Sequence, residues 1–357
     1  MLTETVAGRT YDYSHNVGRG AQSGMGFNFP VDMTLGADGV AYVVSRGSES
    51  IGNVAWNRTG VGQRVGRIVI GNQTGEEEFL GEFSRYGSAE GQLIWPTAIA
   101  ADKQGNLYLT DEWLNRVSVF DKDGTFLRCW DTVQSGDGET NGSAGITIDQ
   151  NETIFITDGR SHKVRMFKSD GTFIKSFGNK GVSEGQFDAP WGLTVDHNGK
   201  VYVADFNNDR VQKFSHDGEF IFALGSSGSG DGEFHRPAGV AVDKDGDIYV
   251  ADTGNDRVQL FDATGRFVEK FLGDASLSRS SVEYLLNNAR PLRLREMTSL
   301  ERQKRLRSPK SVKVDDRGRM FVPDFGSFRV QVYQKDAIPL GPDQIEAPLR
   351  SPTLFTT

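Results

Sequence analysis

The chain has little of several residue types, and each shortage excludes a class of protein. Cys129 is its one cysteine in 357 residues, so an internal disulfide is excluded and a reducing compartment is the default expectation. No apolar run approaches the roughly 18 residues of a membrane-spanning helix, and the N-terminus lacks the basic and then apolar segments of a signal peptide. The net charge of −8 lacks the basic excess that a general nucleic-acid binder needs. We therefore expect a soluble, cytoplasmic protein that binds neither membrane nor nucleic acid.

Glycine, by contrast, is abundant, with 43 residues, and much of it falls within a repeated pattern. Residues 191–214 and 238–261 are identical at fourteen of twenty-four positions. The pattern is Pro-x-Gly, apolar residues, Asp-x-x-Gly, an apolar quartet ending in Asp, and Arg-Val five residues after that Asp. It occurs six times, and we number the copies one to six. Their quartets are 42–45, 108–111, 155–158, 202–205, 249–252 and 321–324.

Each copy of the pattern predicts four short antiparallel strands. The quartet and the Arg-Val segment carry β-branched and aromatic residues, which favour strands. Asp-x-x-Gly is a hairpin turn in which glycine takes a positive φ. A further Asp-Gly turn, such as Asp217-Gly218, precedes the fourth strand. One such sheet cannot bury both its faces, so neighbouring copies must stack, and four-stranded units with a period of about 40–50 residues predict a β-propeller.

The six copies resemble NHL repeats, and the chain resembles a stand-alone six-bladed NHL β-propeller from about residue 8 to 336. The resemblance implies an all-β fold with four antiparallel strands in each blade. Copy six lacks a segment for its outermost strand, whereas Thr10–Val17 reads as a strand without a blade. We therefore expect residues 1–336 to be one propeller, closed by the N-terminal strand so that no sheet edge is left open. Residues 337–357 are predicted to be a Pro-rich tail.

Between blades five and six, at residues 273–308, the strand pattern stops. Two capping-box patterns, Ser280-x-x-Glu283 and Thr298-x-x-Glu301, predict two short helices there. Residues 272–309 hold eight Lys and Arg against four Asp and Glu, a net charge of +4 on an acidic chain. This helical insertion has four open roles: a lid over a pocket, an oligomer contact, a docking site for an acidic partner, or packing against the side of the propeller.

The recurring Asp and Arg residues resemble a set of catalytic residues, but their recurrence in the copies predicts a structural role. A site is needed once, whereas a contact that holds blades together is needed in every blade. We therefore predict hydrogen-bonded pairs between adjacent blades. The residues concerned are Asp111, Asp158, Asp205, Asp252 and Asp324, with Arg116, Lys163, Arg210, Arg257 and Arg329.

Positions where one copy departs from the pattern are the better candidates for a site. In NHL propellers the residue after the blade proline and the residues after the quartet lie toward one face, around the channel mouth. The candidates for catalysis are Asp32, Arg46 and Arg160. The candidates for ligand binding are Trp113, His162, Trp191, Phe206, Lys310 and Phe325. Aromatic walls with a few charges are typical of a small-ligand site; the alternative is that the aromatics fill a tapered channel and the charges form a solvated rim.

Histidine is scarce and gives no metal-binding pattern. Some NHL propellers are zinc-dependent amidating lyases that act on peptidyl-hydroxyglycine, and these place zinc-binding histidines directly after the blade proline. The corresponding residues of this chain are Val31, Thr97, Ala144, Trp191, Ala238 and Lys310. Since none is histidine, the amidating-lyase chemistry is disfavoured and no metal ligand is predicted. No cofactor is identified, and a divalent ion in the channel stays an open alternative.

Three interpretations of function remain open. In the first, the propeller binds a small molecule or a peptide at the channel face. In the second, it is a hydrolase or lyase, metal-independent or with a channel metal, that acts through Asp32, Arg46 and Arg160. In the third, it is a scaffold for protein–protein interactions, with oligomerisation through the insertion as a further expectation.

Overall fold

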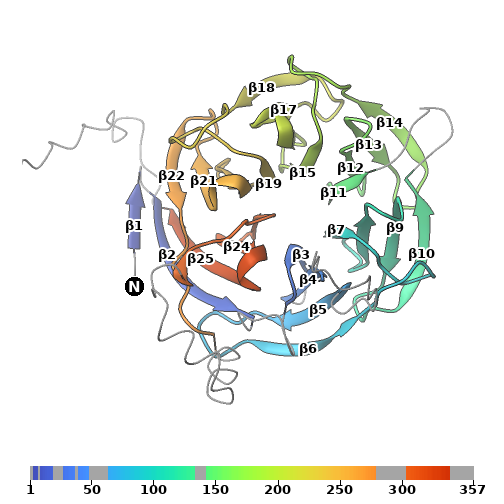
Figure 1. Cartoon of the computed structure of the whole chain (residues 1–357), viewed down its shortest axis with the longest axis horizontal. Coiled ribbons are helices and arrows are strands. Elements are labelled where there is room, and N and C mark those ends of the chain that lie inside the picture. The colour runs from blue at the N-terminus through green and yellow to red at the C-terminus, as the bar shows by residue number, and fades with distance from the viewer. Residues whose placement is uncertain are drawn as a thin grey trace, which may run out of the picture.

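The computed structural model describes residues 3–6, 9–18, 27–36, 39–47, 63–132, 142–278 and 303–337. Its strands form six antiparallel sheets arranged as blades around a central channel (Figure 1). The predicted all-β, six-bladed propeller is therefore confirmed.

Blades one to five each have four strands that run from the channel to the outer rim in chain order (Figure 1). Blade one consists of β3 (Pro30–Leu35), β4 (Val40–Arg46), β5 (Gln63–Val69) and β6 (Glu78–Phe83). Blade two consists of β7 (Pro96–Ala101), β8 (Leu107–Asp111), β9 (Arg116–Phe120) and β10 (Phe126–Asp131). Blade three consists of β11 (Ser143–Ile148), β12 (Ile154–Asp158), β13 (Lys163–Phe167) and β14 (Phe173–Phe177). Blade four consists of β15 (Pro190–Val195), β16 (Val201–Asp205), β17 (Arg210–Phe214) and β18 (Phe220–Leu224). Blade five consists of β19 (Pro237–Val242), β20 (Ile248–Asp252), β21 (Arg257–Phe261) and β22 (Phe267–Phe271).

Blade six combines the two ends of the described chain. Its strands, from the channel outward, are β23 (Lys313–Val314), β24 (Arg319–Asp324), β25 (Arg329–Ala337), β2 (Arg9–Val17) and β1 (Thr3–Val6). Strand β2 pairs antiparallel with β25 along its whole length, from Val17 opposite Val330 to Arg9 opposite Ala337. The N-terminal segment thus closes the ring, and β1 adds a fifth strand that the repeat pattern does not predict.

The core lies between the blades rather than within one of them. Tyr202 and Val211 of blade four, for example, pack in one buried cluster with Val240, Ile248 and Val250 of blade five. Each sheet therefore buries its faces against its neighbours, which is why the repeats stack. Short 3-10 helices follow the second strand in three blades. They are η1 (Phe206–Asn208), η2 (Thr253–Asn255) and η3 (Phe325–Ser327).

In three blades the recurring Asp and Arg residues pair within the blade, so the prediction of pairs between adjacent blades is wrong in its geometry. Arg210 Nε donates to Asp205 Oδ2 at 2.9 Å, which joins neighbouring strands β16 and β17. The same guanidinium donates to three carbonyl oxygens within residues 182–186, in the connection that arrives from blade three. The pair therefore anchors the connector between blades. The same intrablade pair recurs as Arg257–Asp252 and Arg329–Asp324.

The predicted helical insertion falls mostly outside the described residues. Of residues 273–308, the structure describes 273–278 and 303–308, and in these two stretches Gln303 and Lys304 alone are helical. The described residues thus give no support for two helices. The predicted tail, 337–357, is described at Ala337 alone, as the end of β25. Within the described ranges, no helix has the length and hydrophobicity to cross a membrane.

Candidate functional site

Strand register places the candidate residues on one face of the ring. Pro30 pairs with Ser45, and Pro190 pairs with Asp205, so the innermost strand of a blade begins where its second strand ends. Residues after the blade proline therefore share a face with residues that follow the quartet. We call this the mouth face, and the opposite face, which carries the Asp-x-x-Gly turns, the turn face.

The channel narrows at a ring of small residues on the mouth side, which we call the neck ring. Its members occupy the second position after the blade proline. They are Asp32, Ala98, Gly145, Gly192, Gly239 and Ser311. A Cβ on Gly192 would lie 2.4 Å from the carbonyl oxygen of Ala238, so the innermost strands approach too closely for a side chain there. The cavity at this level, the mouth cavity, has about 20 Å³, room for one or two water molecules.

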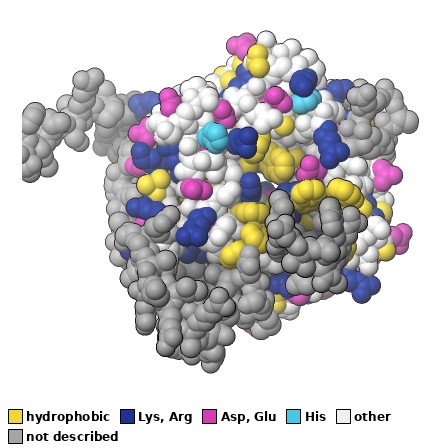
Figure 2. Space-filling view, viewed as in Figure 1, with side chains coloured by type: hydrophobic (Ala, Val, Ile, Leu, Met, Phe, Trp, Pro, Cys, Tyr) yellow, Lys and Arg dark blue, Asp and Glu magenta, His cyan; other side chains and the backbone are white. Residues whose placement is uncertain are grey.

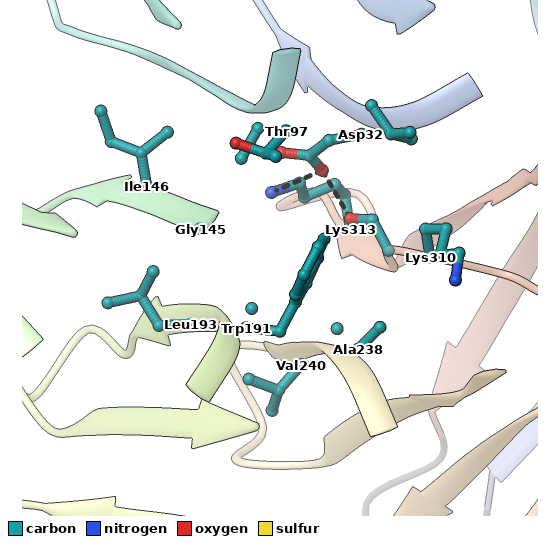
Figure 3. Close-up of a pocket in the computed structure, with 15 residues that line it drawn as sticks. Asp32, Thr97, Gly145, Ile146, Trp191, Leu193, Ala238, Val240, Lys310 and Lys313 are labelled. Carbon is teal, nitrogen blue, oxygen red and sulfur yellow. Dashed lines mark hydrogen bonds and ion pairs between the residues drawn. The ribbon is translucent and has the colours of Figure 1, made fainter. Parts of the chain in front are cut away.

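Asp32 is the charged member of the neck ring, and three donors hold it. Its Oδ2 accepts the backbone N–H of Ile99 at 3.0 Å, in blade two. Its Oδ1 accepts the Ser311 hydroxyl at 2.5 Å and lies 3.1 Å from Lys313 Nζ, both in blade six (Figure 3). The Asp32 side chain is almost fully buried, and a buried carboxylate requires this degree of pairing.

Ser311 and Lys313 are site residues that the sequence analysis missed. Ser311 stands where three blades have glycine, and Lys313 stands where the other blades have alanine or threonine. Both are departures of blade six from the repeat, and together they complement the Asp32 departure of blade one. Comparing departures across the ring seam, rather than within each copy, would have revealed them.

An aromatic pair stands beside the channel in blade four. Trp191 lies at the mouth end of β15, and Phe206 lies in η1, directly after β16. The centroids of their rings are 5.7 Å apart. The Trp191 ring points into the centre of the channel, toward the Asp32–Lys313 pair (Figure 3). The Arg236 guanidinium lies 5.9 Å from the centroid of the Phe206 ring. The pair thus combines apolar surface with a nearby positive charge.

A second aromatic group joins blades six and one. Phe325 packs on Phe29 with ring centroids 4.9 Å apart, and Phe29 also meets Phe328 at 4.8 Å. Lys310 Nζ lies 5.5 Å from the centroid of the Phe325 ring. Here too a cation lies over an aromatic face, in the geometry of a cation–π contact.

The third aromatic group lies at the rim between blades one and two. The Arg46 guanidinium lies 4.4 Å from the centroid of the Trp95 ring, and its Nη2 is 3.4 Å from Glu112 Oε2. Trp113 stands 6.1 Å from Trp95 and is 56% exposed. Tryptophan and arginine are the residue types most enriched among the side chains that dominate binding at protein interfaces, so this group is a candidate contact for a partner.

The two remaining candidates, Arg160 and His162, lie at the mouth end of blade three. The backbone N–H of Arg160 donates to Asp158 Oδ1 at 3.1 Å, and its side chain is exposed. His162 Nδ1 accepts the backbone N–H of Ala189 at 3.0 Å, and this ring also lies 3.6 Å from Asp188. His162 therefore supports the connection between blades three and four.

The predicted residues share a face but not one cavity. Asp32, Trp191 and Lys310 line the mouth cavity. The rest lie on the mouth face without lining that cavity: Arg46, Trp113, Arg160, His162, Phe206 and Phe325. Hydrophobic side chains gather around the central opening of this face, with Lys and Arg among them (Figure 2). The arrangement is a shallow ring of aromatic and basic groups around a narrow neck.

Side chains that could bind a metal ion are not clustered in the part of the chain that the structure describes. Among the residues that the structure describes, no group of three or more His, Cys, Asp or Glu side chains could hold a metal ion. The neck carboxylate, Asp32, is already paired with the Lys313 ammonium. A cation at this position would have to displace that ammonium.

Two family models match parts of the chain. The family described as a 6-bladed beta-propeller matches residues 192–286, and the family described as the SMP-30/Gluconolactonase/LRE-like region matches residues 61–227. The chain is a six-bladed β-propeller, in agreement with the description of the first model, and its repeats resemble the NHL type. Among curated proteins, Protein lin-41 of Caenorhabditis elegans is 42% identical over 45 residues. That match covers 13% of this chain and 4% of lin-41.

Solved structures share the fold at low sequence identity. A structural genomics protein of unknown function from Bacteroides thetaiotaomicron has a TM-score of 0.60 and 16% identity, over 92% of this chain and 76% of that chain. Virginiamycin B lyase from Staphylococcus aureus has a TM-score of 0.50 and 13% identity, over 85% of this chain and 79% of that chain. A streptogramin B lyase structure has a TM-score of 0.51 and 10% identity, over 92% of this chain and 98% of that chain. At these identities the similarity shows the fold alone.

Proposed function

We propose that the chain is a binding module whose mouth face takes up a segment of a partner protein, acidic and with apolar side chains. The observation that carries this proposal is the exposure of Trp113, with Trp95 and Arg46 beside it, at the rim of a channel that is nearly closed. The mouth cavity of about 20 Å³ leaves no room for a deep ligand. A ligand of the mouth face therefore lies on the surface.

The spread of the aromatic groups supports a chain segment over a compact small molecule. The three groups lie on different parts of the ring: Trp95 and Trp113 in blade two, Trp191 and Phe206 in blade four, and Phe29 with Phe325 at the seam of blades one and six. An extended segment spans about 3.3 Å per residue, so a segment of several residues reaches two or more of these groups. Exposed Trp and Arg are also the residue types that dominate binding energy at protein interfaces.

The charges on the mouth face support an acidic ligand. Arg160 and Arg236 are exposed, and no ion pair to either guanidinium occurs within the described ranges. Arg236 lies over the Phe206 ring, and the Arg160 side chain lies beside Gly142 at the mouth end of blade three. Acidic side chains that alternate with apolar ones would pair with these arginines while their neighbours contact the aromatic rings.

The enzyme alternative has less support. A hydrolase or lyase acting through Asp32, Arg46 and Arg160 needs the three side chains around one substrate. Both Asp32 oxygens already accept hydrogen bonds, and neither arginine lines the mouth cavity. The fold shared with lyases carries no catalytic residues across at such low identity.

The test is a selection from a random peptide display library with the whole chain as bait. We expect the selected peptides to be enriched in Asp or Glu and in aromatic or aliphatic residues. Trp113→Ser should weaken the best peptide about tenfold or more, and the pair Arg160→Ser with Arg236→Ser should do the same. Ile221→Ser and Lys168→Ser, at exposed positions elsewhere, are the matched controls. Peptides that bind all these variants equally well would contradict the proposal.

A further inference from the structure

A second ring of side chains surrounds the channel below the neck ring, and we call it the chamber ring. Its members hold the same place in their blades, since each is paired with the aromatic residue that opens the quartet. Thr194, for example, pairs with Tyr202, and Lys313 pairs with Phe321. The ring consists of Thr34, Ala100, Thr147, Thr194, Ala241 and Lys313. All six line a chamber of about 180 Å³, which adjoins the small mouth cavity and shares Ile146, Leu193, Val240 and Lys313 with its lining.

The chamber communicates with solvent at the turn face. Its lining continues past the chamber ring to Ile148, Val242 and Val314, the last residues of their innermost strands. These residues are only partly buried although their strands lie at the centre of the ring. On the other side, the neck ring and the Asp32–Lys313 pair leave space for one or two water molecules. A small molecule therefore enters this chamber from the turn face and stops at the neck.

The polar part of the chamber is rich in hydrogen-bond donors. A lysine ammonium has three N–H groups, and the partner that the structure describes for Lys313 is Asp32. The hydroxyls of Thr34, Thr147 and Thr194 have no hydrogen-bond partner in the part of the chain that the structure describes. The Lys313 side chain is 28% exposed, so its remaining donors are accessible from the channel. Such a set of donors fits a ligand that accepts hydrogen bonds.

The remaining side chains of the lining are aliphatic but expose little surface to the chamber, which limits the ligand to a short hydrocarbon. Ile148, Val242 and Val314 present branched hydrocarbon, and Ala100 and Ala241 leave space beside them. One ammonium supplies the positive charge, and Asp32 already shares it, so a dianion would be poorly compensated. A single negative charge on a short hydrocarbon matches both parts of the chamber.

We propose that the chamber is a binding site for a small aliphatic monocarboxylate. The carboxylate accepts hydrogen bonds from the Lys313 ammonium and from the threonine hydroxyls, and the hydrocarbon lies against Ile148, Val242 and Val314. The site differs from the mouth-face function in its ligand and in the face from which that ligand approaches, although Lys313 lines both the chamber and the mouth cavity.

Methyl NMR of the whole chain tests this inference, with butyrate as the probe. Butyrate should shift the methyl resonances of Ile148 and Thr147 with a Kd of about 10 mM or tighter, and inorganic phosphate should bind more weakly. The methyl group of Ile221, on the outer strand β18, is the internal control and should not move. An Ile148 signal that does not shift would overturn the proposal, and so would tighter binding of phosphate than of butyrate.

Two variants distinguish the contributions of the Asp32 and Lys313 charges to butyrate binding. The first is the double variant Asp32→Ala with Lys313→Thr. Alanine already occupies the neck-ring position in blade two, as Ala98, and threonine occupies the chamber-ring position in blade one, as Thr34. The double variant is therefore expected to fold. It should bind butyrate at least about tenfold more weakly. Asp32→Asn removes the competing negative charge and should tighten butyrate binding about tenfold. Unchanged affinity in the double variant, or weaker binding by a folded Asp32→Asn variant, would overturn the assignment of Lys313 as the carboxylate-binding group.

Discussion

At the scale of single residues, two side chains that differ from their counterparts in the other blades place a charged pair in the channel. Asp32 in blade one and Lys313 in blade six lie 3.1 Å apart across the ring seam. Neither residue matches its counterparts in the other blades, yet each is the other's partner. A residue pair of this kind is coupled in stability, because removal of one charge leaves the other buried without compensation.

Lys313→Thr should therefore destabilise the chain, by about 2 kcal/mol. This is below the cost for a fully buried pair, because the Lys313 side chain is 28% exposed and Asp32 keeps its other two donors. Adding Asp32→Ala should restore most of the loss. Urea unfolding of the two single variants and the double variant measures this coupling. Additive losses would contradict the pairing.

His15 should make stability fall in mild acid. Its side chain is fully buried, with Nδ1 2.8 Å from Ser14 Oγ and Nε2 3.0 Å from the carbonyl oxygen of Ile70. Burial lowers the pKa of His15 below its ordinary value, against the opposing effect of the Ile70 carbonyl. The unfolded chain then takes up a proton near pH 6.5 before the folded one does. Stability is fully present above about pH 6.5 and decreases as the pH falls below it.

Melting temperatures at pH 7.5 and pH 5 measure this effect. The decrease between the two pH values should be smaller in His15→Gln than in the native chain. His197→Gln, at an exposed turn, controls for the loss of a histidine. An equal decrease in the native chain and in His15→Gln would show that another group is responsible.

The sequence predicted part of the site at this scale. Asp32, Trp191 and Lys310 were predicted from their departures and do line the mouth cavity. Ser311 and Lys313 were missed because a partner 279 residues away in the chain gives no local signal. The contact exists because the ring closes and brings blade six against blade one, a tertiary effect that the repeat pattern within one blade does not contain.

At the scale of elements, the closing strands are fixed by a buried ionic cluster. Lys335 Nζ in β25 lies 2.5 Å from Asp243 and 2.8 Å from Asp247, both in the turn between β19 and β20 of blade five. Arg9 in β2 pairs with the same Asp247. Burial opposes the charge of Lys335, but its hydrogen bonds with Asp243 and Asp247 outweigh burial, so its pKa is raised. The cluster connects the closing strand, its partner strand and the preceding blade.

Lys335→Met should destabilise the propeller by about 3–5 kcal/mol, because it leaves the Asp243 and Asp247 carboxylates buried without their shared cation. Since the folded pKa is raised, the native chain has this stabilisation at neutral pH and loses it only above about pH 10. Denaturant unfolding at pH 7 measures the loss. Lys244→Met, at an exposed position of the same turn, is the matched control. Equal stability of the two variants would show that the cluster does not hold the closure.

Most elements were predictable from the sequence because the repeat is local. The quartet at 202–205 is the core of β16 (Val201–Asp205), and the segment predicted at 10–17 is β2 (Arg9–Val17). Strand β1 was not predicted, because its four residues, TETV, carry no repeat signal and pair with β2 at the outer edge. The Asp205–Arg210 geometry was predicted wrongly, because spacing in the sequence does not tell a pair within a sheet from a pair between sheets.

At the scale of the whole molecule, charge and shape differ between the two faces. The chain is acidic overall, with a net charge of −8, yet its mouth face exposes Arg160, and Arg236 beside the Phe206 ring. The mouth cavity at the neck ring has about 20 Å³, whereas the chamber on the turn-face side has about 180 Å³. The two faces thus differ in charge and in the size of the cavity that each one opens to.

Binding of an acidic peptide to the mouth face should depend on salt. Raising the salt concentration from 50 to 500 mM should weaken binding several-fold, because the screening length for exposed charges falls from about 14 Å to about 4 Å. The double variant Arg160→Ser with Arg236→Ser should show a smaller dependence. Fluorescence anisotropy of a labelled peptide measures both. A salt dependence that is the same in both proteins would exclude these arginines as the charged contacts.

The central claim is that the mouth face is the binding surface for a protein segment. The most direct measurement is hydrogen–deuterium exchange of the whole chain with and without a peptide selected from the display library. Our account predicts protection of the mouth-face segments around Trp113, Phe206 and Phe325, with unchanged exchange in the turns at 196–199 and 243–246. Protection confined to those turns or to the outer strands, with no change around Trp113, would contradict it.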